Sequence, residues 1–240
     1  MKRFLYSVLL MLCMTSAAQA QVKEGTLSVV PHLGVNISNT SGLKYQYAYK
    51  DLTLRAEKSK AAPGITVGAE ANYQLTDLLY LSAGVDYSLQ RAKFDNITSF
   101  EGEDDNMEYY MGISSNKVKM GYIHVPVMVG CYVYNSLSVK LGVQFGYLTS
   151  AKWSYAMSDI TLDKATGERT YAVPLRSNES MTDMTKKLEV GIPVGVSYEY
   201  EHVLLDLRYY HGLTNVLKDT SSKNHSLSLT VGYRFDLANL

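Results

Sequence analysis

Eight charged side chains recur at alternate positions of otherwise apolar segments, where they could either line an ion path or pair with one another. They are Glu70, Asp86, Lys140, Glu189, Glu199, Asp206, Arg208 and Arg234. If they line an open lumen, the excess of carboxylates over bases favours weak cation selectivity. If they pair, they fill the interior as a hydrogen-bonded network, and some carboxylates are protonated or bonded to tyrosine hydroxyls. We prefer the network, because a narrow barrel encloses room for side chains rather than a channel.

Other residues that could support catalysis or metal binding are scattered along the chain. His32 and His124 share the parity of the eight charges, whereas His211 and His225 lie near the predicted external side. A lipid-modifying enzyme needs a histidine, a serine and a carboxylate at one surface, and no spacing identifies such a triad. The acidic run 101–106 lacks the order of a dedicated calcium loop. We therefore predict no catalytic residue, no metal ligand and no cofactor.

The segments that carry the charges alternate strictly between apolar and polar residues, which is typical of half-buried strands. Eight segments do so: 27–37, 65–73, 79–87, 123–133, 137–145, 188–198, 203–209 and 226–235. Their apolar faces hold no Asp, Glu, Lys or Arg, while glycines share the other face with the charges. That combination suits a crowded polar interior and a lipid-facing exterior. Lipid also requires closure, since an open sheet edge would leave backbone groups unpaired. The sequence predicts an all-β chain, a closed eight-stranded antiparallel up-and-down transmembrane β-barrel.

The connections between these segments alternate in length. Short ones fall at 76–78, 135–136 and 201–202, and long ones at 39–60, 92–116, 152–185 and 216–224. Outer-membrane barrels have short periplasmic turns and longer external loops, so we expect both termini in the periplasm. Pro31, Pro126 and Pro193 fall inside predicted strands and should mark bulges or local breaks, because proline donates no ladder hydrogen bond.

The first twenty residues have the features of a secretory signal peptide: Lys2 and Arg3, then an uncharged run, then a small-residue cleavage site before Gln21. We predict cleavage between Ala20 and Gln21, which leaves one outer-membrane barrel domain over 21–240. The 240 residues carry 23 basic and 23 acidic side chains, a balance that argues against nucleic acid as a partner. A charged fraction of 19% and a mean hydropathy of −0.10 exclude a disordered chain and a multi-helix membrane protein.

Several motifs resemble those of the PorT-like outer-membrane β-barrel proteins of Bacteroidota. The strand that begins at Tyr122 and reaches Pro126 is similar to the tyrosine-to-proline motif of that family, and 141–146, 208–215 and 232–235 are also similar. The resemblance covers essentially the mature chain and implies the fold and the outer membrane. It implies little about activity.

We interpret the chain as a small outer-membrane protein with a structural or interaction role through its long external loops. The partners expected are outer-membrane lipid or lipopolysaccharide, the barrel-assembly machinery during biogenesis, and an envelope or extracellular protein that contacts the loops. Three alternatives remain: a narrow pore or a transport or secretion component, a lipid-acting hydrolase or acyltransferase, and a soluble secreted barrel whose apolar faces point inward.

Overall fold

The computed structural model describes residues 22–43, 45–49, 52–56, 58–218 and 220–239. The predicted signal peptide, with its cleavage site between Ala20 and Gln21, lies outside these residues. The strands are β1 (Thr26–Ser41), β2 (Tyr45–Tyr49), β3 (Leu52–Ala56), β4 (Lys60–Gln74), β5 (Leu79–Lys93), β6 (Ile97–Glu103), β7 (Met107–Tyr134), β8 (Leu137–Asp163), β9 (Arg169–Tyr171), β10 (Leu175–Ser180), β11 (Leu188–Tyr200), β12 (Val203–Gly212), β13 (Lys223–Tyr233) and β14 (Phe235–Asn239). Among the described residues, no helix is long and apolar enough to cross a membrane.

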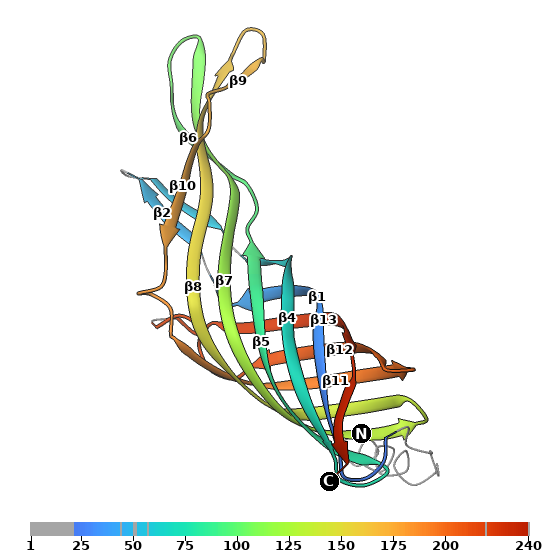
Figure 1. Ribbon diagram of the computed structural model, residues 1–240. Coiled ribbons are helices and arrows are strands. Elements are labelled where there is room, and N and C mark those ends of the chain that lie inside the picture. The colour runs from blue at the N-terminus through green and yellow to red at the C-terminus, as the bar shows by residue number, and fades with distance from the viewer. Residues whose placement is uncertain (1–21, 44, 50–51, 57, 219, 240) are drawn as a thin grey trace, which may run out of the picture.

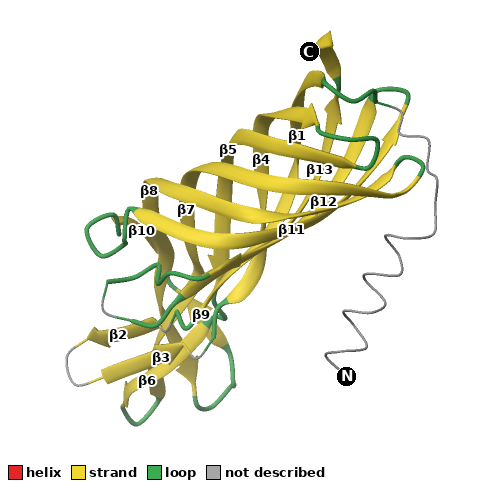
Figure 2. Cartoon of the chain, turned by 90° about the horizontal axis from the view of Figure 1, so that it is seen from below, coloured by secondary structure: helices red, strands yellow, loops and turns green. Residues whose placement is uncertain are grey.

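Eight of these strands form a closed antiparallel ring, which confirms the predicted fold class (Figure 2). The order around the ring is β8, β11, β12, β13, β1, β4, β5 and β7, and pairing between β7 and β8 closes it. Each predicted segment lies within one of these strands or, for the last, ends at the first residue of β14. Closure gives every strand of the ring two neighbours, so backbone groups at the level of the bilayer have partners without water.

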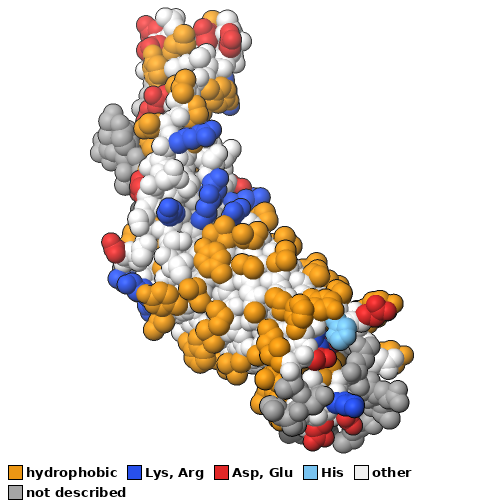
Figure 3. All heavy atoms as spheres, in the orientation of Figure 1, with side chains coloured by type: hydrophobic (Ala, Val, Ile, Leu, Met, Phe, Trp, Pro, Cys, Tyr) orange, Lys and Arg blue, Asp and Glu red, His pale blue; other side chains and the backbone are white. Residues whose placement is uncertain are grey.

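The apolar faces of the ring point outward, as predicted. Leu33 is 70% exposed and Val143 is 43% exposed, and apolar side chains cover the outside of the barrel (Figure 3). A surface of this kind suits lipid and would promote aggregation in water. The soluble barrel with inward apolar faces is therefore wrong for this chain.

The glycines on the inner face make room for large side chains in a narrow lumen. A Cβ atom added at Gly130 would clash with the ring of Tyr80, which is buried on the lumen side of β5. The Tyr80 hydroxyl in turn lies 2.9 Å from Ser138 Oγ. The space that a side chain at Gly130 would take is thus filled by a tyrosine from the neighbouring strand, which explains why glycines and charges share one face.

Three tight connections lie at one end of the ring, which we call the turn end; the opposite end is the loop end. Residues 75–78 join β4 to β5, residues 135–136 join β7 to β8, and residues 201–202 join β11 to β12. Glu201 and His202 both have positive φ angles, 54° and 108°, as two-residue hairpin turns of the favoured hand require. The C-terminal strand β14 pairs with β1 at this same end (Figure 1).

The three prolines coincide with breaks in the hydrogen-bonded ladder, as predicted. At Pro126 the register between β5 and β7 is interrupted, and at Pro193 the register between β8 and β11 is interrupted. At Pro31 the partner of β1 changes from β13 to β14. Each proline keeps regular pairing with its other neighbour, so the ring stays closed.

The long connections 92–116 and 152–185 were expected as loops, and this expectation is wrong. Strand β7 is 28 residues long and β8 is 27, whereas a strand that spans a membrane needs about 10. Both strands therefore continue well past the ring. Above the ring, β6 replaces β5 as the neighbour of β7, while β10 and β9 replace β11 as neighbours of β8. The result is a sheet that projects from the loop end, which we call the extension (Figure 1). Because solvent meets this sheet on more than one face, its sequence lacks the alternation that marks the barrel strands.

An apolar cluster lies between the lumen and the extension. Strand β8 has a bulge at Thr149, opposite Gly121 and Tyr122. Before the bulge the even-numbered side chains of β8 point inward, and after it the odd-numbered ones do, such as Ala151 and Tyr155. These residues pack with inward residues of β7 and of the loops. The cluster comprises Leu43, Phe94, Met111, Ile113, Val118, Met120, Tyr122, Leu148, Ala151, Tyr155 and Val216. It closes the loop end of the lumen with hydrophobic side chains.

The face assignment predicts unequal costs for one substitution at two adjacent positions of β8. Val143→Arg places a charge against lipid and should lower the free energy of unfolding by about 2–4 kcal/mol. Gln144→Arg should cost less, because Gln144 is buried in the lumen beside a cavity that Asp86 and Asp206 also line. Urea unfolding of both variants in lipid vesicles measures the difference. Equal costs would contradict the assignment.

Candidate functional site

The eight charges singled out in the sequence are all buried inside the ring. Five of them meet at its centre. Arg208 Nη2 donates to Glu70 Oε2 at 2.6 Å, and its Nη1 and Nε lie 3.6 Å from Asp86 Oδ2 and 3.3 Å from Asp206 Oδ1. Lys140 Nζ pairs with Asp206 and lies 3.3 Å from Glu70 Oε1. We call these five residues, with His32, the central cluster.

His32 completes the charge balance of the central cluster. Its Nε2 lies 2.9 Å from Asp86 Oδ1, and its Nδ1 lies 3.2 Å from the carbonyl oxygen of Val30. Both neighbours are acceptors, so the doubly protonated imidazolium satisfies both contacts. Three carboxylates then face three cations. Charges removed from water need such pairing, because an isolated buried ion costs several kcal/mol.

The other three predicted charges form smaller clusters on either side of the centre. Toward the loop end, Glu189 Oε1 lies 3.1 Å from His124 Nε2, and its Oε2 accepts from Asn224 Nδ2 at 2.7 Å. Toward the turn end, Arg234 Nη2 lies 2.6 Å from Glu199 Oε2 and donates to the Tyr132 hydroxyl at 3.1 Å. The eight residues thus form three separate groups rather than one continuous row along the lumen.

Little empty space remains among these groups. Two cavities inside the ring measure about 30 Å³ and about 10 Å³, so neither exceeds the volume of roughly one water molecule. Gln144 and Tyr210 contribute to the wall of the larger one. A hydrated ion needs a continuous path, and cavities of this size do not provide one.

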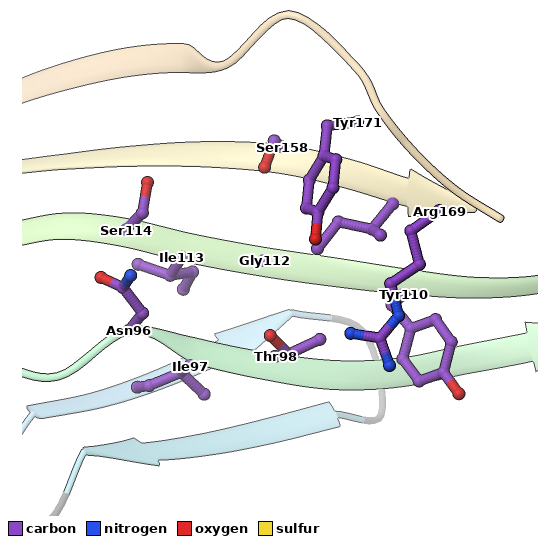
Figure 4. Close-up of a pocket in the computed structure, with 11 residues that line it drawn as sticks. Asn96, Ile97, Thr98, Tyr110, Gly112, Ile113, Ser114, Ser158, Arg169 and Tyr171 are labelled. Atoms are coloured by element: carbon purple, nitrogen blue, oxygen red, sulfur yellow. The ribbon is translucent and has the colours of Figure 1, made fainter. Parts of the chain in front are cut away.

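The extension contains a separate pocket of about 310 Å³ on the surface of its sheet. Side chains from β6, β7, β8 and β9 line it, and Gly112 forms part of its floor (Figure 4). Tyr110 and Tyr171 supply aromatic rings, Arg169 a positive charge, and Asn96, Thr98, Ser114 and Ser158 polar groups, with Ile97, Ile113 and Ile160 completing the lining. Pockets that bind ligands combine apolar surface with a few polar groups in this way.

The acidic run near residue 104 makes a structural turn at the tip of the extension. Asp104 Oδ1 accepts from the backbone N–H groups of Asn106 and Met107, and its Oδ2 accepts from the Tyr109 hydroxyl at 2.7 Å. These hydrogen bonds lower the pKa of Asp104 below its usual value, and the bond from Tyr109 contributes most. Nearby Lys164 Nζ lies 2.7 Å from Glu103 Oε2. Within the part of the chain that the structure describes, no group of His, Cys, Asp and Glu is arranged to hold a metal ion.

The outer histidines lie together at the loop end. His211 and His225 face each other across β12 and β13 with ring centroids 4.9 Å apart. His225 Nε2 is 3.1 Å from Ser41 Oγ, and its Nδ1 is 3.3 Å from the Tyr209 hydroxyl. A serine and a histidine are therefore in contact, but the orienting partner is a phenol rather than the carboxylate of a triad.

Sequence reasoning missed the pocket of the extension and the apolar cluster. Both depend on bulges: the register between β7 and β8 shifts at Thr149 and again near Ser115, which has a positive φ of 55°. A bulge moves every later side chain of its strand to the opposite face. The sequence carries no strong signal for either position, so alternation alone could not locate them.

The chain belongs to the family described as outer membrane protein beta-barrel domain, whose model matches residues 18–218. It is therefore an outer-membrane β-barrel protein. A search of curated protein sequences found no match.

Several solved structures are similar to the chain at low identity. Neisserial surface protein A is 16% identical, with a TM-score of 0.43, and the match covers 88% of this chain and 100% of that one. The attachment invasion locus protein Ail of Yersinia pestis is 14% identical with a TM-score of 0.36, over 88% and 99% of the two chains. OprG from Pseudomonas aeruginosa is 10% identical with a TM-score of 0.37, over 90% and 99%.

The pairing in the central cluster predicts a large effect of Arg208→Met on stability. The change leaves Glu70, Asp86 and Asp206 with too few cations, and breaking a buried ion pair on one side typically costs about 3–5 kcal/mol. The matched control is Lys23→Met at the exposed turn end, which should change the free energy of unfolding by less than about 0.5 kcal/mol. Urea denaturation in detergent compares the two. If Arg208→Met is as stable as the control, the cluster does not hold the barrel together.

Proposed function

We propose that this protein is an interaction protein of the outer membrane, in which the barrel anchors the extension and the extension binds a partner from the envelope or the extracellular space. In this proposal the loop end faces the outside of the cell, both termini lie in the periplasm, and the chain is exported by a signal peptide cleaved between Ala20 and Gln21. The polar network fills the lumen and has a structural role. The narrower membership in the PorT-like proteins of Bacteroidota is part of the same proposal and rests on the motif that begins at Tyr122.

The continuation of β7 and β8 beyond the ring is the observation that carries this proposal. A barrel that only filled the membrane would need about 10 residues per strand, and these two strands have 28 and 27. The added length supports a sheet with β6 at one edge and with β9 and β10 at the other, and such edges can pair with an extended segment of another chain. The extension also carries exposed apolar side chains, among them Val173, which is 93% exposed.

The pocket of the extension is the best candidate for the contact. Two tyrosines and an arginine are residue types that are enriched at protein interfaces, where a few such side chains contribute most of the binding energy. Arg169 and Tyr171 come from β9 and Tyr110 from β7, so the pocket joins strands on both sides of β8. A partner seated there would contact the rigid part of the extension rather than a loop.

Photo-crosslinking in living cells tests the proposal. A crosslinking amino acid at Thr98 or Ser158, which line the pocket, should yield a discrete product of higher mass. The control position is Ser41, at the end of β1 away from the extension, which should yield none. Adding Arg169→Ala and Tyr171→Ala should reduce the product at least about tenfold, because residues of this type often contribute more than about 1.4 kcal/mol each.

Two outcomes would contradict an interaction role for the pocket. One is an equal yield from Ser41 and from the pocket positions, and the other is an unchanged yield in the Arg169→Ala/Tyr171→Ala double variant. Heat-dependent migration on a detergent gel shows that each variant still forms a barrel, so a loss of product is assigned to the contact and not to misfolding.

The second candidate function is a narrow pore or a transport component. The three charge clusters and the apolar cluster argue against it, because together they occupy the lumen from the turn end to the loop end. Purified protein in a planar bilayer should therefore show no steady conductance in about 1 M potassium chloride, a salt concentration that screens surface charges. Steady single-channel steps from the folded protein would overturn the structural role of the network.

A further inference from the structure

Basic side chains occupy two adjacent rungs on the outer surface of four neighbouring strands. In one rung Arg91 of β5 pairs with Lys119 of β7, which pairs with Lys152 of β8. In the next rung Lys60 of β4 pairs with Lys93 of β5, which pairs with Lys117 of β7. We call these six residues the basic rim.

The basic rim lies directly beyond the apolar belt of the barrel, toward the loop end. Along the outer face of β5 the residues run Val85, Tyr87, Leu89, Arg91 and Lys93, so the surface changes from apolar to cationic within one step of the strand. Lys and Arg side chains gather at this boundary, between the apolar surface of the barrel and the extension (Figure 3). This is the level at which lipid headgroups meet a membrane protein.

The positive charges of the rim are largely uncompensated. Like charges directly opposite one another in a sheet are destabilising, and the rim contains four such pairs. Lys60 Nζ lies 2.7 Å from Asp95 Oδ1, but the other five bases form no ion pair with a residue that the structure describes. In addition, Arg91 Nε is buried and has no hydrogen-bond partner among the described residues. A site with these properties favours an anion from outside the chain.

A hollow beside the rim provides space for such an anion. It measures about 310 Å³, and its lining includes Lys117, Lys119 and Arg176, together with the polar side chains of Ser154 and Asn178. Arg176 belongs to β10, which pairs with β8 at the base of the extension. Cations from two strands therefore converge with hydrogen-bonding groups on one concave surface, an arrangement that suits a phosphate.

We propose that the basic rim and its hollow bind the phosphate groups of a phosphorylated glycolipid in the leaflet at the loop end. The rim supplies cations for the phosphates, and the apolar belt below supplies a surface for the acyl chains of the same molecule. A free anion would use the bases alone, so the adjacency of the two surfaces favours a lipid. The site depends on the proposed function only in that the loop end faces outward, and it is separate from the pocket of the extension.

Binding of diphosphoryl lipid A to the purified protein in a neutral detergent tests this site. The test variant is Lys119→Gln/Lys152→Gln, and the matched control is Lys218→Gln/Lys223→Gln, which removes the same charge from the first residue of β13 and the loop before it, outside the basic rim. Each base near an anionic headgroup adds about 1 kcal/mol of attraction, so the test variant should bind roughly thirty-fold more weakly than the parent protein. The control variant should bind like the parent, and Lys119→Arg/Lys152→Arg should restore binding.

Two further probes identify the source of the phosphate. Dephosphorylated lipid A should bind the parent protein and the test variant equally and weakly, and inorganic phosphate at matched concentration should neither bind measurably nor compete. Equal binding of the phosphorylated and dephosphorylated lipids would overturn the proposal, because the apolar belt alone would then account for it. Effective competition by inorganic phosphate, or an equal loss in the control variant, would also overturn it. None of these results depends on the crosslinks at the pocket of the extension, so the two proposals fail separately.

Discussion

The pairing of charges inside a narrow lumen is the constraint on which the rest of this structure depends. Lipid outside the ring forces polar side chains inward, and eight strands leave no room for bulk water around them. The charges therefore pair with one another: Arg208 and Lys140 pair with three carboxylates, and Arg234 pairs with Glu199. Two histidines lie against the remaining carboxylate oxygens, His32 beside Asp86 and His124 beside Glu189. Glycines such as Gly146 leave room for these side chains, because a Cβ atom there would meet Glu189.

The extension follows from the same need to satisfy the backbone. Where β7 and β8 leave the ring, each loses one neighbour, and β6, β9 and β10 take the vacant places. The two strands therefore continue as one rigid sheet instead of ending in loops. The apolar cluster at their base separates the polar lumen from the exposed surfaces above it. An anchored sheet with a pocket is suited to binding, whereas a filled lumen is not suited to transport.

The outer surface is divided by depth in the same way. Apolar residues cover the level of the hydrocarbon, the basic rim covers the level of the headgroups, and the extension with its tyrosine-lined pocket lies beyond both. The proposed lipid site and the proposed partner site thus occupy different depths of one molecule. Such a division allows lipid to fix the base of the extension while its tip remains free to bind.

Strict alternation in the sequence predicts the class of fold, the eight strands of the ring and the inward position of all eight charges, because the contrast between lipid and lumen acts locally, residue by residue. It also located the tight turns and the breaks at the prolines. It did not determine the pairings of the charges, the compensating role of His32 or the length of β7 and β8. Those features were decided by the tertiary structure, since they depend on which strands become neighbours and on the bulge at Thr149 that resets the facing of β8. The basic rim shows the same limit: its lysines are scattered from residue 60 to residue 152, and only the register of four strands brings them into one surface.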